Sequence, residues 1–385
     1  MSSNPPRRIA IALPSTGDDE WQAVREPIFS GWLTQGPKVA AFERAFAARH
    51  GVPHALATTS CTTALHLALL GLGIGPGDEV IVPAFTWVAT ANAVLYCGAQ
   101  PVLCDVDRRS FNIDPADAAR RVTPRTRAVI AVHLFGLCAD MDGLRDALPP
   151  GVAIVEDAAC AAGAELAGRP AGGLGAAAAF SFHPRKSITT GEGGMVTTSD
   201  PEVASRIDVL RNHGASVSEE IRHRGPRPYL LPDFDVLGYN YRMTDLQASV
   251  GLAQLGKLDR FIEERRRWAA WYGEALADLP WLRTPAEPGN GAHAWQSYVC
   301  SVDQARAPMP RNALMERLQE RGIATRPGTH AIHMLGVYRD RYGLRPDDLP
   351  AARDCDRDSL AIPLHNRMSA EDYAYVAEAL HDLRA

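Results

Sequence analysis

The segment with the clearest capacity for chemistry is residues 181–194, SFHPRKSITTGEGG, in which Lys186 lies between an apolar strand pattern and a glycine-rich turn. A lysine placed there can be held out of bulk water, where its amine loses part of its preference for the protonated form and becomes a usable nucleophile. An enzyme that forms a Schiff base needs such an amine. A strand, a polar turn and one lysine also occur without chemistry, so the interpretation depends on companion segments.

The first companion is IVEDAA, an apolar strand pattern that ends in Glu156 and Asp157. Ligands of open α/β sheets bind at strand ends, so Asp157 is the candidate carboxylate to face a cofactor. A carboxylate beside a pyridine nitrogen keeps that nitrogen protonated and lets the ring accept electrons. The alternative is that Glu156 or Asp157 only caps the next helix.

The second companion is TTSCTTALHLAL at residues 58–69, where small hydroxylated residues open an apolar helical pattern. Free backbone N–H groups and the helix dipole make such a start suitable for a phosphate. Thr59 or Ser60 would serve equally as an ordinary N-cap.

Two further segments supply aromatic and polar groups. In PAFTWVATAN, Phe85 or Trp87 follows a strand and could stack on a flat heteroaromatic ring, or either could pack in the core. In GYNYRMTDLQA, Asn240 and Arg242 are polar groups without an obvious local partner, before a helix start at Thr244.

Taken together, the segments closely resemble the DegT/DnrJ/EryC1/StrS family of pyridoxal-phosphate aminotransferases, best known for building amino sugars. The resemblance runs from about residue 36 to the C-terminus. It implies that Lys186 carries the cofactor, that Asp157 lies under the pyridine nitrogen, and that Trp87 stacks on the ring.

The resemblance also implies how the phosphate is held. Ser181 binds it, with Cys61 and Thr62 at the helix start. Asn240 reaches the cofactor phosphate of a neighbouring subunit, which implies an obligate homodimer with shared active sites.

One position departs from the family pattern. Where the family usually has Gln or His in contact with the phenolic oxygen of the cofactor, this chain has Cys160, whose thiol is a weak hydrogen-bond partner. A related branch of sugar dehydratases has histidine in place of the lysine. The presence of Lys186, with His183 three residues earlier, disfavours that reading.

Composition fits an enzyme of two domains: 385 residues, 46% hydrophobic and 22% charged. A net charge of −5 argues against nucleic acid as a partner. Seven scattered cysteines without a C-x-x-C pair suit a reducing cytoplasm. His330 and His333 lack further candidate ligands, so no metal site is expected. The apolar run near residues 1–11 is too short for the core of a signal peptide, so none is expected. Glu165 and Arg169 interrupt the Ala/Gly-rich stretch 158–180, so no membrane span is expected there.

Apolar strand patterns alternate with helical patterns through the first half of the chain, which predicts a mostly parallel α/β sheet. The expected strands are 55–57, 80–82, 102–104, 128–132, 153–155 and 177–182, and the expected helices are 61–73, 86–97, 114–121 and 140–148. The resemblance implies fold type I, the aspartate aminotransferase type, with a seven-stranded sheet and a smaller C-terminal α/β domain.

The pattern changes after residue 244 to a long charged helix at 244–278, followed by a strand at 295–302 and a helix at 311–321. We therefore expect a cofactor domain at 1–245 and a small domain at 246–385.

The substrate side is less defined by the residues. Arg224 and Arg227 belong to a basic loop that is either solvated or grips a diphosphate. His183 and His330 are further candidate substrate contacts. The expected reaction moves an amino group from glutamate to a keto sugar, first of all a nucleotide-diphosphate-linked 4-keto- or 3-keto-deoxy sugar. A keto-cyclitol or other carbocyclic ketone is the alternative acceptor, and a non-catalytic binding or regulatory protein is the alternative of another class.

Overall fold

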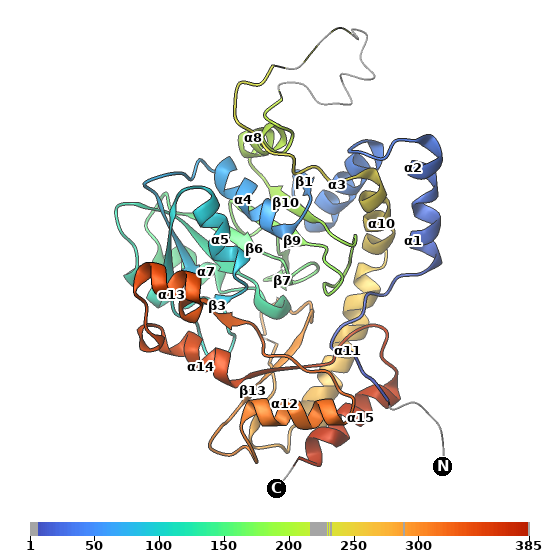
Figure 1. The fold of residues 1–385 in the computed structure, drawn as a ribbon, viewed down its shortest axis with the longest axis vertical. Helices are drawn as coiled ribbons and strands as arrows, with labels where there is room; N and C mark the ends of the chain where they lie inside the picture. The colour runs from blue at the N-terminus through green and yellow to red at the C-terminus, as the bar shows by residue number, and fades with distance from the viewer. Residues whose placement is uncertain (1–6, 216–228, 230, 232, 288, 384–385) are drawn as a thin grey trace.

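The computed structural model describes residues 7–215, 229, 231, 233–287 and 289–383. Its centre is a seven-stranded sheet (Figure 1). In spatial order the strands are β1 (His54–Thr58), β10 (Gly194–Thr198), β9 (Ala177–Ser181), β6 (Ala153–Asp157), β5 (Thr126–Val132), β2 (Glu79–Pro83) and β4 (Gln100–Cys104). The pairs from β9 to β4 are parallel, and β10 runs antiparallel to both β1 and β9. The expected mostly parallel, seven-stranded sheet is confirmed.

β10 is the one strand of this sheet that the alternation of strands and helices did not predict. It returns antiparallel to β9 after the glycine-rich turn, without a crossover helix, which only an antiparallel connection permits. The register places Gly194 opposite Ser181 on one side and opposite Thr58 on the other. The turn that carries Lys186 is thereby fixed beside the end of β1.

Both faces of the sheet are buried. On β2, Val80 and Val82 belong to one apolar cluster and Ile81 to another, as expected for a strand covered by helices on both sides. The helices of this part are α1 (Asp18–Ala23), α2 (Arg25–Ser30), α3 (Pro37–His50), α4 (Cys61–Gly71), α5 (Ala89–Tyr96), α6 (Pro115–Arg120), α7 (Met141–Ala147) and α8 (Pro201–Arg211).

The single helix expected at 244–278 is wrong. The structure has two helices, α10 (Asp245–Leu255) and α11 (Leu258–Ala275), separated at Gly256 and Lys257. The break places the Lys257 ammonium within 2.7 Å of Glu20 and 2.9 Å of Asp19 on α1. An interruption of two residues cannot be seen in the apolar periodicity, because the apolar positions of the second helix continue the spacing of the first.

The C-terminal part forms a second layer with its own core (Figure 1). Its sheet has the order β11 (Leu282–Arg283), β13 (Tyr298–Val302) and β15 (Ser359–Ile362), and its helices are α12 (Arg311–Glu320), α13 (Gly336–Tyr342), α14 (Pro350–Asp358) and α15 (Ala370–His381). Ile9, near the start of the chain, packs in this core and its N–H bonds Gly322 O at 2.8 Å. The domain boundary at residue 245 stays a prediction.

Two short ladders join the parts of the chain. β14 (His330–Ala331) pairs with β3 (Phe85–Thr86), and the Ile332 N–H continues the contact to Ala84 O at 2.7 Å. β7 (Glu165–Leu166) lies between β8 (Arg169–Pro170) and β12 (Gly291–Ala292). No helix in the described part of the chain is long and apolar enough to cross a membrane.

Candidate active site

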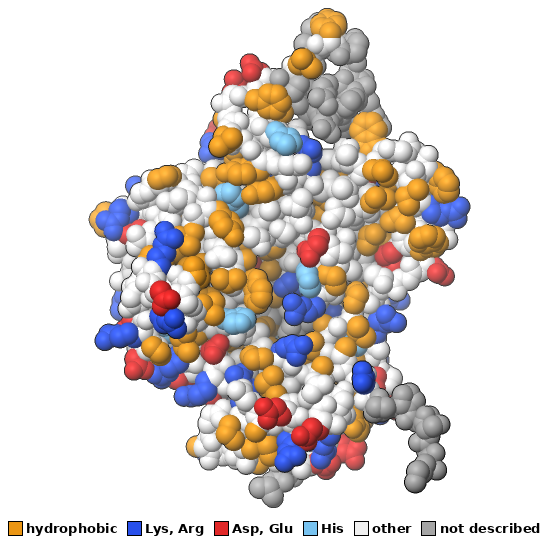
Figure 2. Space-filling view, in the orientation of Figure 1, with side chains coloured by type: hydrophobic (Ala, Val, Ile, Leu, Met, Phe, Trp, Pro, Cys, Tyr) orange, Lys and Arg blue, Asp and Glu red, His pale blue; other side chains and the backbone are white. Residues whose placement is uncertain are grey.

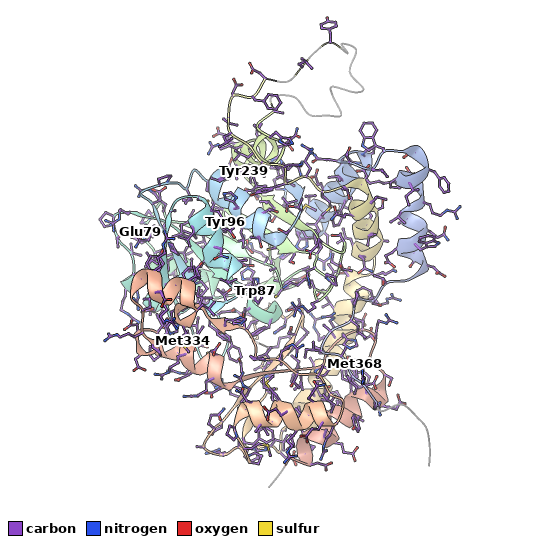
Figure 3. The ribbon with its side chains drawn as sticks, viewed as in Figure 1. Glu79, Trp87, Tyr96, Tyr239, Met334 and Met368 are labelled. Atoms are coloured by element: carbon purple, nitrogen blue, oxygen red, sulfur yellow. The ribbon has the colours of Figure 1, made fainter. Side chains whose placement is uncertain are left out.

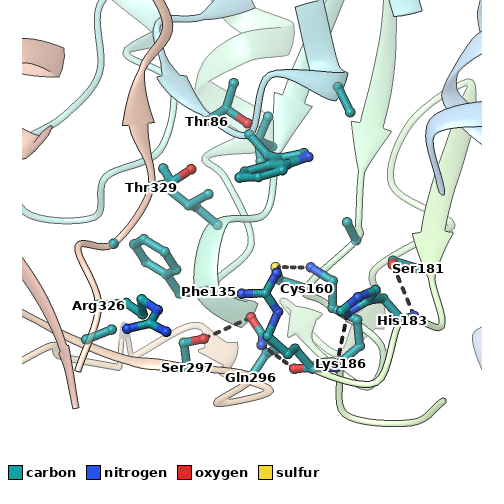
Figure 4. Close-up of a pocket in the computed structure, with 18 of the residues that line it drawn as sticks. Thr86, Phe135, Cys160, Ser181, His183, Lys186, Gln296, Ser297, Arg326 and Thr329 are labelled. Atoms are coloured by element: carbon teal, nitrogen blue, oxygen red, sulfur yellow. Dashed lines mark hydrogen bonds between the residues drawn. The ribbon is translucent and has the colours of Figure 1, made fainter. Parts of the chain in front are cut away.

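A cavity of about 740 Å³ opens at the carboxyl ends of β5, β6 and β9 (Figure 4). The register pairs Val132 with Asp157 and Asp157 with Ala179, so the residues that follow these strands meet at one edge of the sheet. The structure brings nine residues named from the sequence into this cavity: Cys61, Thr62, Trp87, Asp157, Cys160, Ser181, His183, Lys186 and His330.

Three named residues are not part of that group. Asn240 is exposed, pairs with Asn212 in an isolated bridge, and does not line the cavity. Arg224 and Arg227 lie outside the described residues. Their expected roles toward a partner subunit and a diphosphate stay predictions.

Lys186 is distinguished from the other lysines by its surroundings. The chain has three lysines, and two of them form ion pairs, Lys38 with Glu26 and Lys257 with Glu20. The Nζ atom of Lys186 instead donates a hydrogen bond to Cys160 Sγ at 3.1 Å, inside the cavity (Figure 4). Cys160 therefore contacts the amine that is expected to carry a cofactor.

The expectation that burial leaves the amine of Lys186 weakly protonated is wrong for the protein without cofactor. Burial lowers the pKa of Lys186, but Cys160, Cys61 and the carboxylate of Asp157 raise it, and together they hold the pKa above its ordinary value. The hydrogen bond to Cys160 and the neighbouring Asp157 act against desolvation here. The amine must lose its proton before it can act as a nucleophile.

Asp157 is a buried carboxylate whose two hydrogen-bond donors are both uncharged. It is 5% exposed, and it accepts hydrogen bonds from Thr90 Oγ1 at 2.8 Å and from Ala159 N at 3.2 Å. Burial raises the pKa of Asp157, and the two hydrogen bonds and Lys186 offset this only in part. A cationic nitrogen placed against this carboxylate would supply the missing charge.

Glu156, the neighbouring acid, has a different role. Adjacent residues of a strand point to opposite faces, and Glu156 points away from the cavity. It accepts hydrogen bonds from three backbone N–H groups, those of Gly172, Leu174 and Gly175, and from His133 Nε2 at 2.9 Å. Burial would raise the pKa of Glu156, but His133 and the backbone donors hold it below its usual range. Glu156 thus fixes the 172–175 loop instead of capping a helix.

The start of α4 presents a helix N-terminus to the cavity. Ser60 caps the helix, since its Oγ accepts from Thr63 N at 3.2 Å, and the first-turn residues Cys61 and Thr62 line the cavity. A Cβ on Gly194 would come within 2.4 Å of the Ser60 carbonyl oxygen, so only glycine lets β10 approach this turn. Because Gly194 also pairs with Ser181, the serine hydroxyl and the helix N-terminus lie near each other.

The aromatic alternatives are separated by burial. Phe85 is fully buried in the core, whereas Trp87 is 57% exposed and lines the cavity. The ring of Trp87 lies 5.5 Å from the ring of His330, centroid to centroid, because β14 pairs with β3. Trp87 is therefore the ring available for stacking.

The C-terminal part contributes Gln296 and Ser297, from the stretch 293–298 where substrate-facing residues were expected, and also Arg311 and Arg326, which the sequence motifs missed. Gln296 Nε2 donates to Arg185 O at 2.8 Å and so attaches this wall to the turn before Lys186. Arg311 begins α12 and Arg326 lies in the segment between α12 and β14, and neither residue belongs to a motif with a chemistry of its own. A Thr-Arg-Pro-Gly turn at 325–328 was the one local signal.

The cavity offers three kinds of group: a lysine amine, a buried carboxylate and a helix N-terminus. They match the aldehyde, the pyridine nitrogen and the phosphate of pyridoxal phosphate, and the cavity volume lies in the usual range for ligand sites. Among residues that the structure describes, no group of three or more His, Cys, Asp and Glu side chains could hold a metal ion.

A family model agrees with the geometry. The model of the DegT/DnrJ/EryC1/StrS aminotransferase family matches residues 14–381. Among curated proteins, the spore coat polysaccharide biosynthesis protein SpsC of Bacillus subtilis is 41% identical over 377 residues, which cover 97% of both chains. GDP-perosamine synthase of Caulobacter vibrioides is 41% identical over 376 residues, again 97% of both chains.

The fold has a counterpart among solved structures. A putative sugar aminotransferase, Spr1654 from Streptococcus pneumoniae in its PMP form, superimposes with a TM-score of 0.92 and 27% identity, covering 98% of this chain and 99% of that one. The expectation of fold type I is confirmed.

Proposed function

The chain belongs to the DegT/DnrJ/EryC1/StrS aminotransferase family, and on this premise we propose that it transfers the amino group of L-glutamate to a nucleotide-diphosphate-linked 4-keto- or 3-keto-deoxy sugar. It is a pyridoxal-phosphate-dependent aminotransferase of amino-sugar biosynthesis, not a non-catalytic binding protein. The observation that carries the acceptor is the 41% identity, over 97% of both chains, to a protein named for a GDP-linked amino sugar.

The residues of this chain divide the work of holding the cofactor. We assign the phosphate to Ser181 and the start of α4, the pyridine nitrogen to Asp157, and one face of the ring to Trp87. When bound, pyridoxal phosphate supplies a ring that accepts the electron pair left when a C–H bond next to the amine breaks.

Lys186 is assigned the proton transfer. Its Nζ would take the proton from the α-carbon of the amino donor and return a proton at the reacting carbon of the cofactor, acting as general base and then as general acid. Asp157 would keep a proton on the ring nitrogen of the bound cofactor. Asp157 is buried at the end of β6, and the low exposure to water would strengthen its charge interaction with the ring.

The proposed acceptor predicts a preference that a single-turnover assay measures. Enzyme first converted to its amine-loaded form with glutamate is expected to transfer nitrogen to a nucleotide-linked keto-deoxy sugar and not to a free keto-cyclitol of similar ring size. The aminated product is quantified by mass spectrometry, and recovery of the visible cofactor band reports turnover. Equal or faster transfer to the free ketone would contradict the proposal in favour of a carbocyclic acceptor.

We also propose a homodimer, supported by exposed apolar side chains. Two surface stretches carry them: Trp21, Ile28, Phe29 and Leu33 in and after α1 and α2, and Tyr96, Phe234, Val236 and Leu237 nearer α5 and α8. Phe29 is 80% exposed and Leu237 is 88% exposed. Apolar side chains that are exposed in groups, and not singly, mark a surface that contacts another protein. Figure 2 shows apolar side chains gathered over α1 and α2, and Figure 3 labels Tyr239, Tyr96 and Trp87 one below another.

The dimer predicts a solution mass of twice 41.6 kDa in sedimentation velocity. A Phe29→Asp substitution is expected to shift the population toward the monomer by placing a charge in the buried contact. Asn240 is exposed and follows Leu237 in the second apolar stretch, and in the dimer it would reach the cofactor site of the partner subunit. The monomer should therefore bind the cofactor more weakly. A wild-type monomer with full activity would contradict both statements.

A further inference from the structure

Arg326 is a cationic group of the cavity without an acidic partner. It lies between α12 and β14, and its backbone is held at both ends by Ala361, with Arg326 N to Ala361 O at 3.3 Å and Ala361 N to Arg326 O at 2.8 Å. The guanidinium donates one hydrogen bond, from Nη1 to Thr325 O at 2.9 Å. In the part of the chain that the structure describes, no carboxylate lies within ion-pair distance of it.

Two other charged groups of the cavity, Arg311 and Asp157, differ from Arg326 because they are already engaged. Arg311 is buried, bonds Ser359 O at 2.7 Å and lies in the field of Asp356. Asp157 is committed to the ring nitrogen. Arg185, next to Lys186, likewise has no carboxylate partner among the described residues. The cavity lining therefore includes two guanidinium groups without a carboxylate partner among the described residues, which suits a ligand with two acid groups.

A loop contact gives Arg326 a defined neighbourhood. Ser297 N donates to Phe135 O at 3.2 Å, and a Cβ on Gly328 would come within 2.9 Å of Phe135 Cζ. Phe135 thus connects the Ser297 loop to the turn that carries Arg326. Figure 4 shows Arg326 and Ser297 on the wall from the C-terminal part, and the Lys186–Cys160 contact on the other wall.

We propose that Arg326 binds one carboxylate of a dicarboxylate amino donor, a positioning role that rests on the proposed function with glutamate as donor. A guanidinium presents two parallel N–H groups in one plane, which match the two oxygens of a carboxylate. A diphosphate spreads its charge over more oxygens and calls for several cations or a helix N-terminus. This wall supplies one uncommitted guanidinium and a serine hydroxyl, which fit the smaller group.

Binding of two non-reacting probes tests the assignment on the loaded enzyme. Glutarate represents the donor and GDP the nucleotide of the acceptor, and both are titrated by tryptophan fluorescence, for which Trp87 lies in the cavity. Arg326→Gln is expected to weaken glutarate about 10- to 100-fold, the usual loss for a charged hydrogen-bond pair, and to leave GDP unchanged. The glutarate affinity of Arg326→Lys should fall between those of wild type and Arg326→Gln, because lysine keeps the charge and loses the two parallel N–H groups.

Kinetics give the second readout. The KM for glutamate in its half-reaction should rise with the glutarate constant, while the rate at saturating glutamate stays within a few-fold of wild type. Arg317→Gln is the matched control, since Arg317 is exposed on α12 and pairs with Glu320. Thermal unfolding of each variant verifies the fold.

The outcomes separate the possible errors. Loss of GDP binding with glutarate unchanged would overturn the assignment of Arg326. A wild-type enzyme that neither binds glutarate nor reacts with glutamate would overturn it together with the proposed donor. A wild-type enzyme that reacts with glutamate but aminates no nucleotide-linked ketose would remove the proposed acceptor and leave the result for Arg326 intact.

Discussion

Replacement of Lys186 by alanine is expected to abolish amino transfer. The residue supplies both the attachment point for the cofactor and the base that moves the proton, and the proton transfer alone accounts for a factor on the order of 10²–10⁴. Steady-state rates with glutamate and a nucleotide-linked ketose measure the loss. Lys186→Arg should be equally inactive, because a guanidinium stays protonated and cannot attack a carbonyl group.

The chain offers unusually clean controls for that experiment. Only Lys38 and Lys257 could substitute as attachment points, and both amines are held in ion pairs away from the cavity. Lys38→Ala should keep full activity. Reduction of the loaded enzyme with borohydride and peptide mapping should place the cofactor on Lys186, and a tag on either other lysine would refute the assignment.

Asp157→Asn is expected to lower kcat by about three orders of magnitude. Two opposite charges 4 Å apart attract by about 4 kcal/mol at an effective dielectric constant of 20, which corresponds to about 10³-fold in rate. Asparagine keeps the shape and can still bond Thr90 and Ala159, so the variant removes the charge and little else. Rapid-mixing kinetics of the glutamate half-reaction measure the effect on the proton-transfer step.

Asp157→Asn should lower activity but raise the folding stability of the cofactor-free protein. Burial raises the pKa of Asp157 in the folded protein, so the folded wild type loses stability as the pH rises from the unfolded-state pKa through the folded-state pKa. Asparagine avoids this loss. Urea unfolding of cofactor-free protein at pH 7 should therefore show a more stable variant, with the difference vanishing below about pH 4.

Thr90→Val separates the hydrogen bond from the charge. It removes the donor to Asp157 Oδ2 and should reduce kcat only about 10-fold, in line with one hydrogen bond to a charged group. A loss as large as that of Asp157→Asn would mean that Thr90, and not the carboxylate charge, carries the effect.

The residues that could be found from the sequence share one property: each follows a strand of its own motif. Asp157 and Ser181 end β6 and β9, and Lys186 lies in the turn after β9. Parallel strands bring their carboxyl ends to one edge, so local motifs sufficed to place these groups in a common site. The helix start at Ser60 was readable for the same reason, since capping is a local interaction.

What the sequence left open depends on contacts between distant segments. The pKa of Lys186 depends on its burial and on Cys160, Cys61 and Asp157, which come from separate segments of the chain. Arg326 enters the site because β15 holds its backbone, a contact that no periodicity reveals. The roles of Glu156 and Asp157 were undecided, because both faces of the sheet are buried and strand alternation alone does not say which of the two side chains faces the cavity.

The ladder between β14 and β3 has a consequence for substrate entry. It joins the C-terminal part to the rim of the cavity through main-chain hydrogen bonds, including Ile332 N to Ala84 O, directly before Trp87. A hinge at this point would have to break those bonds at every turnover. We therefore expect the entrance to stay closed to widening on the Trp87 side, so that a bulky acceptor extends out of the cavity into solvent.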